Sequence, residues 1–279
     1  VSADKIRELS KDVMDHGPLL ALAGGNLVAT DQCVETLTAV NILNAVSGAL
    51  GKTIRFYDQD PAEISSHNEV KKLIVGLNSG QIKLLIIDDS NPVYALPPSM
   101  EFIKAMQKAF VVSIASQRSE TTHASNLVLP ALTAYESWGD AFPRNGVRSI
   151  QQPVMIAVNM FDAKAREDIL LNAVKGVNKN AFSGITGYLD YLQNKWREIQ
   201  SEIGNTDNFE NFWISVLENG GIFQNPEFSS VKLSRKVTSA KLNDPGMAGK
   251  DGLTLLPTSS ILHGDGSGAN KPWLQEVPN

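Results

Sequence analysis

Apolar and polar residues alternate regularly over the first 150 residues of the chain. In the segment 2–15, Ile6, Leu9 and Val13 recur at helical spacing among charged residues, which predicts an amphipathic helix with Ser2 as its N-cap. The apolar run 18–23 is short and ends at two glycines, so it predicts a buried parallel strand that leads into a tight turn. The pattern therefore begins with a helix followed by a strand.

The same alternation continues to about residue 130. It predicts helices over 32–50, 64–78 and 99–108, and strands over 53–57, 83–88, 109–114 and 126–129. The inward side of the first of these helices is predicted to be Val34, Leu37, Val40, Ile42 and Val46, with Gly51 closing the helix. Strands and helices that alternate at this spacing predict an α/β fold, a Rossmann-like doubly wound parallel sheet with flanking helices on both faces.

The pattern changes after Pro153. Helices are predicted over 162–174, 185–200 and 207–218, and from residue 219 onward Gly, Asn, Ser and Pro dominate, with one strand-like run at 252–256. We therefore predict two domains. Residues 1–153 form an α/β dinucleotide-cradle domain, and residues 154–279 form a helical segment with an irregular C-terminal extension that leads towards a further domain.

Composition narrows the classes of protein to consider. Hydrophobic residues make up 42% of the 279 residues and charged residues 20%, which is typical of a globular protein. The net charge of −5, without a stripe of Lys and Arg, makes nucleic acid an unexpected partner. The longest apolar runs are much shorter than the roughly 20 residues of a membrane span, so we expect no span. The chain starts at Val1 without a signal segment, and we expect it to be an interior piece of a longer protein.

The residues that commonly carry redox or catalytic chemistry are few. Cys33 is the only cysteine, so the chain has no internal disulfide and cannot hold a cysteine-ligated iron–sulfur cluster, which needs about four thiolates. The four histidines show no metal-ligand spacing, and no nucleophile–histidine–carboxylate arrangement can be assigned from spacing. We therefore predict no metal site, no catalytic residue and no redox centre in this chain.

Three polar or glycine-rich loops follow predicted strands. Ligands of parallel sheets collect at the carboxyl ends of the strands, where glycines allow close approach and polar side chains contact sugars or phosphates. The predicted cofactor-binding residues are Gly24, Gly25 and Asn26 of the first loop, Asp88, Ser90 and Asn91 of the second, and Gln117, Arg118, Glu120 and Thr121 of the third. Each loop can equally be an ordinary turn, and the argument for a site is that all three are expected at one edge of one sheet.

Two other glycine-rich segments are interpreted as ordinary loops. Gly51-Lys52-Thr53 has the end of a phosphate-binding loop, but it lies between a helix and the next strand, which is the opposite order to such a loop. The segment 264–268 is not followed by a strong helix that could direct its N-terminus at an anion.

The segment 84–153 resembles the molybdopterin-guanine-dinucleotide oxidoreductases. The residues that carry the resemblance are 88–92 (DDSNP), 110–114 (FVVSI), Glu120-Thr121, 124–130 (ASNLVLP), Glu136 with Trp138-Gly139, and 145–148 (NGVR). The earlier segment 22–26 (LAGGN) and the helix after it are similar to the glycine loop and helix of that family. The terminal segment 270–278 (NKPWLQEVP) is most similar to alternative complex III, in which a molybdopterin-type domain is fused to an iron–sulfur domain.

The resemblance implies two alternative functions. In the first, the chain is a cofactor-free scaffold domain of a respiratory complex, with an iron–sulfur domain or subunit and membrane subunits as partners, on the periplasmic side of a bacterial inner membrane. In the second, it binds the molybdopterin guanine dinucleotide of an active molybdenum oxidoreductase. We favour the scaffold because the terminal segment 270–278 is most similar to alternative complex III and because Asp88 and Asp89 put negative charge where a diphosphate would lie. Ser125-Asn126 in place of the family's Ala-Asp pair favours it too. The two functions differ upstream of this region, where an enzyme of the family must carry its metal ligand.

A third interpretation is a nicotinamide-dependent dehydrogenase. That class needs Gly-x-Gly-x-x-Gly after the first strand and an acidic residue about 20 positions later. Gly24-Gly25 alone does not meet this pattern.

Overall fold

A computed structural model describes residues 2–24, 33–57, 65–158, 161–226, 228–238, 262–264, 268 and 271–276. Contacts divide the chain into two units, which we call the terminal unit (Val1–Gln59 with Pro226–Asn279) and the central unit (Asp60–Asn225). The predicted domains 1–153 and 154–279 rest on the change in sequence pattern after Pro153, whereas these two units rest on contacts. The two predicted domains therefore stay a prediction. The strand-like run 252–256 lies outside the described residues.

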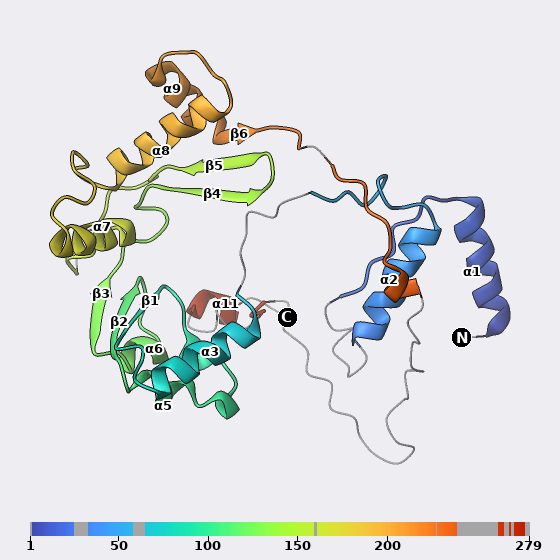
Figure 1. Cartoon of the computed structure of the whole chain (residues 1–279), viewed down its shortest axis with the longest axis horizontal. Helices are drawn as coiled ribbons and strands as arrows, with labels where there is room; N and C mark the ends of the chain where they lie inside the picture. Colours follow the sequence, from blue (N-terminus) through green and yellow to red (C-terminus); the bar gives the residue numbers. More distant parts are fainter. Residues whose placement is uncertain are drawn as a thin grey trace. The chain divides into compact units, whose positions relative to one another are not determined.

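The described residues of the terminal unit include several helices. Its helices are α1 (Ala3–Asp15), α2 (Cys33–Val46), α10 (Arg235–Thr238) and α11 (Pro272–Glu276) (Figure 1). The first of these confirms the predicted amphipathic helix, and the Ser2 side chain caps it by accepting the backbone N–H of Lys5 at 3.4 Å.

The predicted buried strand at 18–23 is wrong. The side-chain amide of Asn44 accepts the N–H of Ala21 at 2.7 Å and donates to its carbonyl at 2.9 Å, so one side chain satisfies the backbone groups that a neighbouring strand would have bonded. Leu22 is 81% exposed, which a buried strand would not allow. The run is extended chain held against α2.

Helix α2 differs from the prediction in its end point and in the side that faces inward. The helix ends at Val46 rather than at residue 50, and Gly48, at φ 77°, takes the left-handed conformation in the turn that follows. Asn44 is buried, whereas Val34, Leu37 and Val46 of the predicted inward side are exposed. Pairing of Asn44 with Ala21 therefore fixes which side of the helix faces inward.

The predicted strand at 53–57 is also wrong. Two isolated bridges are formed there, a parallel one between Leu50 and Ile54 and an antiparallel one between Phe56 and Ser229. The guanidinium of Arg55 lies 4.8 Å from the ring centre of Phe228 in the segment that Phe56 pairs with.

The central unit contains the predicted parallel sheet. Its strands are β1 (Leu84–Asp88), β2 (Phe110–Ala115) and β3 (Leu127–Pro130), and both neighbouring pairs are parallel (Figure 1). This confirms a mixed α/β fold with a three-stranded parallel sheet flanked by helices. The order β1-β2-β3 follows the chain, without a reversal among the described strands such as a doubly wound sheet has, so the Rossmann-like arrangement stays a prediction.

One face of this sheet packs on helices. The helices are α3 (His67–Asn78), α4 (Pro92–Ala95), η2 (Pro98–Met100, a 3-10 helix), α5 (Phe102–Met106) and α6 (Glu120–His123). Leu77 of α3 and Met106 of α5 are fully buried against Ile87 and Val111 of the strands. The predicted helix over 99–108 is shorter because Glu101, at φ 50°, separates η2 from α5.

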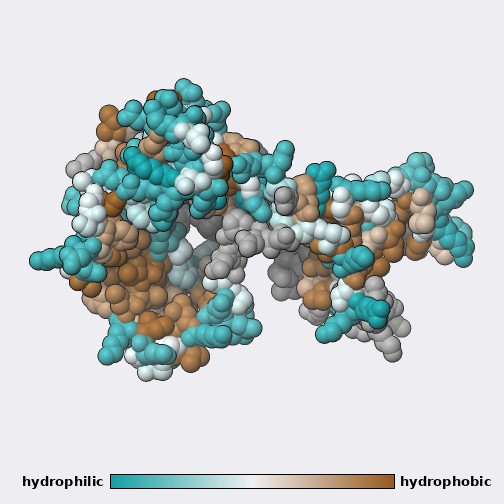
Figure 2. All heavy atoms as spheres, turned by 45° about the horizontal axis from the view of Figure 1, so that its top comes forward, coloured by the Kyte–Doolittle hydropathy of each residue, from teal (hydrophilic) through white to brown (hydrophobic). Residues whose placement is uncertain are grey.

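The other face of the sheet carries exposed apolar side chains. Leu84, Ile86, Phe110 and Leu127 are between 42% and 55% exposed, and the parallel register places them on the side opposite to Ile87 and Val111. The brown area low on the left of Figure 2 lies where β1–β3 lie in Figure 1. Ile114 lies on the same side and is buried, so this face has half-exposed apolar side chains around a covered one.

A second sheet completes the central unit and was not predicted. It is antiparallel, in the order β4 (Gly139–Arg144), β5 (Val147–Gln151) and β6 (Gly221–Phe223). Three helices accompany it, namely α7 (Arg166–Val177), α8 (Tyr188–Glu202) and α9 (Phe209–Asn219), and these confirm the three helices predicted after residue 153 with shifted ends. Trp196 is fully buried where α8, α9 and the second sheet meet.

Candidate functional site at the carboxyl edge of the parallel sheet

The loops that follow β1 and β2 lie together, as the sequence predicts. The backbone N–H of Asp89 donates to the carbonyl of Ile114 at 2.8 Å, which continues the pairing of the two strands by one residue. Asp89 takes a left-handed conformation at φ 40°, and this turns the chain out of β1. The next residues therefore pass above the end of β2.

Asn91 and Thr121 form the centre of the site. The side-chain carbonyl of Asn91 accepts both the N–H of Thr121 at 3.1 Å and its hydroxyl at 2.7 Å. The Asn91 amide donates to the carboxylate of Glu120 at 2.7 Å, and the Thr121 hydroxyl accepts the N–H of Val93 at 3.1 Å. Thr121 is fully buried, so these bonds lock the second predicted loop to the start of α6.

A second group of bonds surrounds Asp89. One oxygen of its carboxylate accepts the Ser116 N–H at 3.2 Å and the Ser116 hydroxyl at 3.0 Å, and the other accepts the Arg166 guanidinium at 3.2 Å. Burial raises the pKa of the Asp89 carboxyl, but these bonds and the positive charge of Arg166 outweigh it and hold the pKa below its ordinary value. Asp89 is therefore ionised, and both of its oxygens accept hydrogen bonds from within the chain.

Arg166 is the residue of this site that sequence reasoning missed. It starts α7, and its guanidinium lies 3.7 Å from Asp88, 3.2 Å from Asp89 and 4.0 Å from Glu167. Arg166 lies 77 positions from Asp89 in the chain, and no local pattern links the two. The acidic pair Asp88-Asp89 was the sequence signal for such a residue, because two adjacent carboxylates are stabilised by a nearby cation.

The remaining predicted residues have different positions. Ser90, Gln117 and Arg118 are exposed in the loops of the sheet edge. Gly24 belongs to the terminal unit and does not follow a strand, so the reason for expecting it at this edge is removed. Gly25 and Asn26 lie outside the described residues.

The charge of the site decides what it can bind. Asp88, Asp89 and Glu120 contribute three carboxylates, and the hydrogen bond from Asn91 lowers the pKa of Glu120, so it too is ionised. The guanidinium of Arg166 is shared among carboxylates. A diphosphate would have to lie beside this negative charge and would find the Asn91, Ser116 and Thr121 donors already bonded. This negative charge opposes a phosphate beside Asp88 and Asp89, whereas Arg118, exposed in the loop after β2, is a cation at the same edge.

Searches for other kinds of site within the described part of the chain give negative results. No group of three or more His, Cys, Asp or Glu side chains is placed to hold a metal ion there. Among the helices that the structure describes, none is both long enough and apolar enough to cross a bilayer. His123, the histidine nearest the site, bonds through Nδ1 to the Ser119 carbonyl at 2.8 Å within its own helix turn.

Neither the models of known protein families nor the curated proteins give a match to this sequence.

Proposed function

We propose that this chain is part of a molybdopterin-oxidoreductase-like subunit of a respiratory electron-transfer complex, where it acts as a scaffold domain without a pterin cofactor. The family assignment rests on the sequence resemblance over 84–153. The observation that carries the scaffold role is that the polar groups of Asp89, Asn91 and Thr121 at the sheet edge are bonded within the chain. A site built for a cofactor keeps donors available for it, and here the donors hold the loops together.

The electrostatic argument supports the same role. Dinucleotide sites place a helix N-terminus or cationic side chains at the phosphates. In this chain the equivalent edge has Asp88 and Asp89, and the nearby Arg166 is bonded to Asp89 at 3.2 Å. A phosphate would have to displace a carboxylate from that guanidinium before gaining any attraction of its own.

The partners follow from the resemblance. An iron–sulfur domain or subunit would perform the electron transfer, membrane subunits would anchor the complex, and the position would be the periplasmic side of a bacterial inner membrane. The chain would contribute rigid surface, and the half-exposed apolar side chains Leu84, Ile86 and Phe110 on one face of its parallel sheet would be part of it.

The decisive experiment is metal and pterin analysis of the parent protein purified in its complex from native membranes. We expect iron from the partner domain, and neither molybdenum nor tungsten at stoichiometric level, with no fluorescence from oxidised pterin. Stoichiometric molybdenum or tungsten together with that fluorescence would overturn the scaffold role and identify a cofactor-binding domain of an active oxidoreductase.

A second measurement uses the 279-residue chain. Titration with GDP, which represents the nucleotide end of the cofactor, should show no saturable heat of binding for the natural sequence. Saturable binding that strengthens in Asp88→Asn would mean that the edge retains a nucleotide site limited only by its charge.

A further inference from the structure

The chain has two Asn-Gly pairs, and the structure places them in different surroundings. Asn145-Gly146 lies between β4 and β5, whereas Asn219-Gly220 ends α9 just before β6. Asparagine is a chemically labile residue, and a glycine after it leaves the next backbone nitrogen without a Cβ that would hinder its approach. The two pairs therefore share the same intrinsic chemistry, and a difference between them comes from the fold.

Asn145 and Gly146 form the whole turn of the β4–β5 hairpin. Arg144 pairs with Val147 across the hairpin, so these two residues connect the strands. Asn145 is exposed, and Gly146 takes the left-handed conformation at φ 80°. Among the described residues, neither the Asn145 side-chain amide nor the Gly146 N–H has a hydrogen-bond partner. The side-chain amide and the backbone nitrogen that follows it are therefore both free to move.

Asn219 is also exposed, but its groups are bonded. Its side-chain nitrogen donates to the carbonyl of Ser215 at 2.7 Å and to the Ser215 hydroxyl at 3.3 Å. The Gly220 N–H donates to the carbonyl of Leu217 at 3.4 Å in the cap of α9, and the Gly220 carbonyl accepts the N–H of Ile150 at 3.1 Å. A reaction between the Asn219 amide and the Gly220 nitrogen would first have to break these bonds.

We propose that Asn145 is a site of spontaneous deamidation through a succinimide formed with Gly146. The backbone nitrogen of Gly146 attacks the side-chain carbonyl carbon of Asn145, the bond from that carbon to the amide nitrogen breaks, and ammonia leaves with the proton of the Gly146 N–H. Water then opens the ring at either carbonyl and gives aspartate or isoaspartate. Water is the only reactant consumed, and the proposal does not depend on the scaffold role.

The modification would act on the hairpin that contains it. Isoaspartate adds a backbone carbon to a tight turn, and the length of such a turn fixes the register of its strands. The Gly146 carbonyl also accepts the N–H of Gln224, the residue after β6, at 2.7 Å. The isoaspartate product should therefore loosen the pairing around the turn, whereas aspartate keeps the backbone and adds a negative charge between Arg144 and Arg148 in the sequence.

The test is incubation of the full 279-residue chain in mildly alkaline buffer, followed by digestion with pepsin in acid and mass spectrometry of the peptides. Deamidation is measured as the mass gain when oxygen replaces the amide nitrogen, and chromatography separates the aspartate and isoaspartate peptides. We expect Asn145 to be converted at least about tenfold faster than Asn219, because the reaction at Asn219 requires local opening of the end of α9. Equal rates at the two pairs, or an unreacted Asn145, would overturn the proposal.

The same chain in urea is the reference for the intrinsic chemistry. In urea the two pairs should react at rates within about twofold of each other, because neither keeps its native hydrogen bonds. A tenfold difference that persisted in urea would show that neighbouring residues set the rates, and it would overturn the role given to the fold.

Asn145→Gln is the matched variant, because glutamine keeps the amide while its longer side chain closes the ring much less readily. It should abolish the conversion in the hairpin peptide and leave the rate at Asn219 unchanged. A mass gain that persisted in the hairpin peptide of this variant, with its fold verified by circular dichroism, would place the reactive amide elsewhere. The comparison of the two pairs in the natural chain remains valid even if the variant fails to fold.

Discussion

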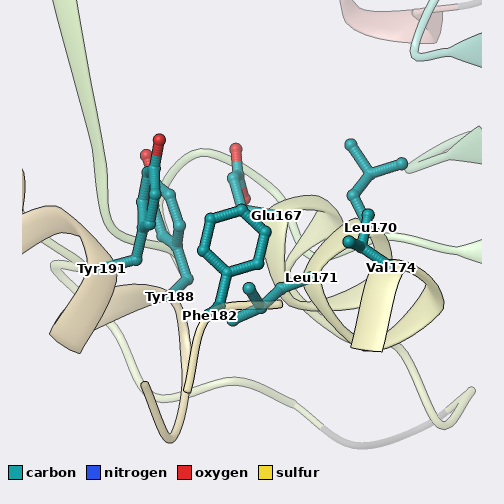
Figure 3. Close-up of a pocket in the computed structure, with 7 residues that line it drawn as sticks. All are labelled: Glu167, Leu170, Leu171, Val174, Phe182, Tyr188 and Tyr191. Atoms are coloured by element: carbon teal, nitrogen blue, oxygen red, sulfur yellow. The ribbon is translucent and has the colours of Figure 1, made fainter. Parts of the chain in front are cut away.

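Two neighbouring residues, Arg166 and Glu167, take part in two sites of opposite character. Arg166 reaches the carboxyl edge of the parallel sheet, where Asp89, Asn91 and Thr121 have bonded partners within the chain. Glu167 lines an apolar pocket between α7 and α8, which Figure 3 shows, and one of its oxygens is buried without a partner. In the first arrangement the polar groups bond to one another and hold the loops in place. In the second, one carboxylate oxygen has no hydrogen-bond donor. The difference separates a polar cluster that stabilises the fold from a buried polar atom whose hydrogen bond is unmet.

The largest effect is expected from Thr121→Val, which tests whether the sheet edge is structural. The hydroxyl of Thr121 donates to Asn91 and accepts from Val93, and the residue is fully buried. Its removal would leave the Val93 N–H without that acceptor and should lower the free energy of unfolding by about 2–3 kcal/mol. Urea denaturation measures this, with Thr206→Val at an exposed position before α9 as the control. A loss below about 0.5 kcal/mol would mean that the cluster does not stabilise the fold.

Arg166→Met should have the next largest effect because it removes the cation on which the sheet edge depends. The carboxylates of Asp88 and Asp89 would lose their common counter-charge, and we expect a loss of about 1–2 kcal/mol near pH 7 after allowing for partial solvent screening. Arg7→Met, at an exposed pair on α1, should cost little. The same loss in both variants would show that the Arg166 pairs are ordinary surface pairs.

Asp89→Asn tests the bonds of the Asp89 carboxylate through the pH dependence of stability. The pKa of Asp89 is below its ordinary value, so its stabilisation is present above the pKa of the unfolded carboxyl and is lost as pH falls through the lowered pKa of the folded state. We expect Asp89→Asn to cost about 1 kcal/mol at pH 7 and progressively less below pH of about 4. Thermal unfolding across that range measures it. Asp88→Asn, which changes a carboxylate 3.7 Å from the guanidinium, should have a smaller effect.

Glu167→Gln should have the smallest effect on stability, and with the opposite sign. Burial raises the pKa of Glu167, so its folded state favours the protonated form, and stability is lost as pH rises from the unfolded pKa through the raised one. The variant should be more stable than the natural chain by about 0.5–1 kcal/mol at pH 7 and equal to it near pH 4. Destabilisation at pH 7 would show that the carboxylate already has a favourable partner.

Local features of the fold could be predicted from the sequence. Ser2 precedes an amphipathic repeat and caps α1, and the strands β1 and β2 appear as continuous apolar runs bounded by polar residues. Each of these signals lies within a few consecutive residues, so distant parts of the chain do not change the element that it predicts.

Features decided by distant partners could not be predicted. The run 18–23 is as apolar as β1, yet the amide of Asn44 occupies its backbone groups. The antiparallel sheet had one local signal, the Asn145-Gly146 turn between β4 and β5, but its third strand lies some 70 residues further along the chain. In the site, Asn91, Glu120 and Thr121 were predicted together, whereas Arg166 and the pocket around Glu167 come from a helix whose rotation no local pattern fixes.

That rotation has a consequence for insertions and deletions. Each residue turns an α-helix by about 100°, so removing one residue inside α7, between Glu167 and the buried Leu171, would turn Arg166 away from Asp89 while Leu171 keeps its place in the core. The spacing of residues in the first turns of α7 is therefore constrained by a polar contact and an apolar contact at once.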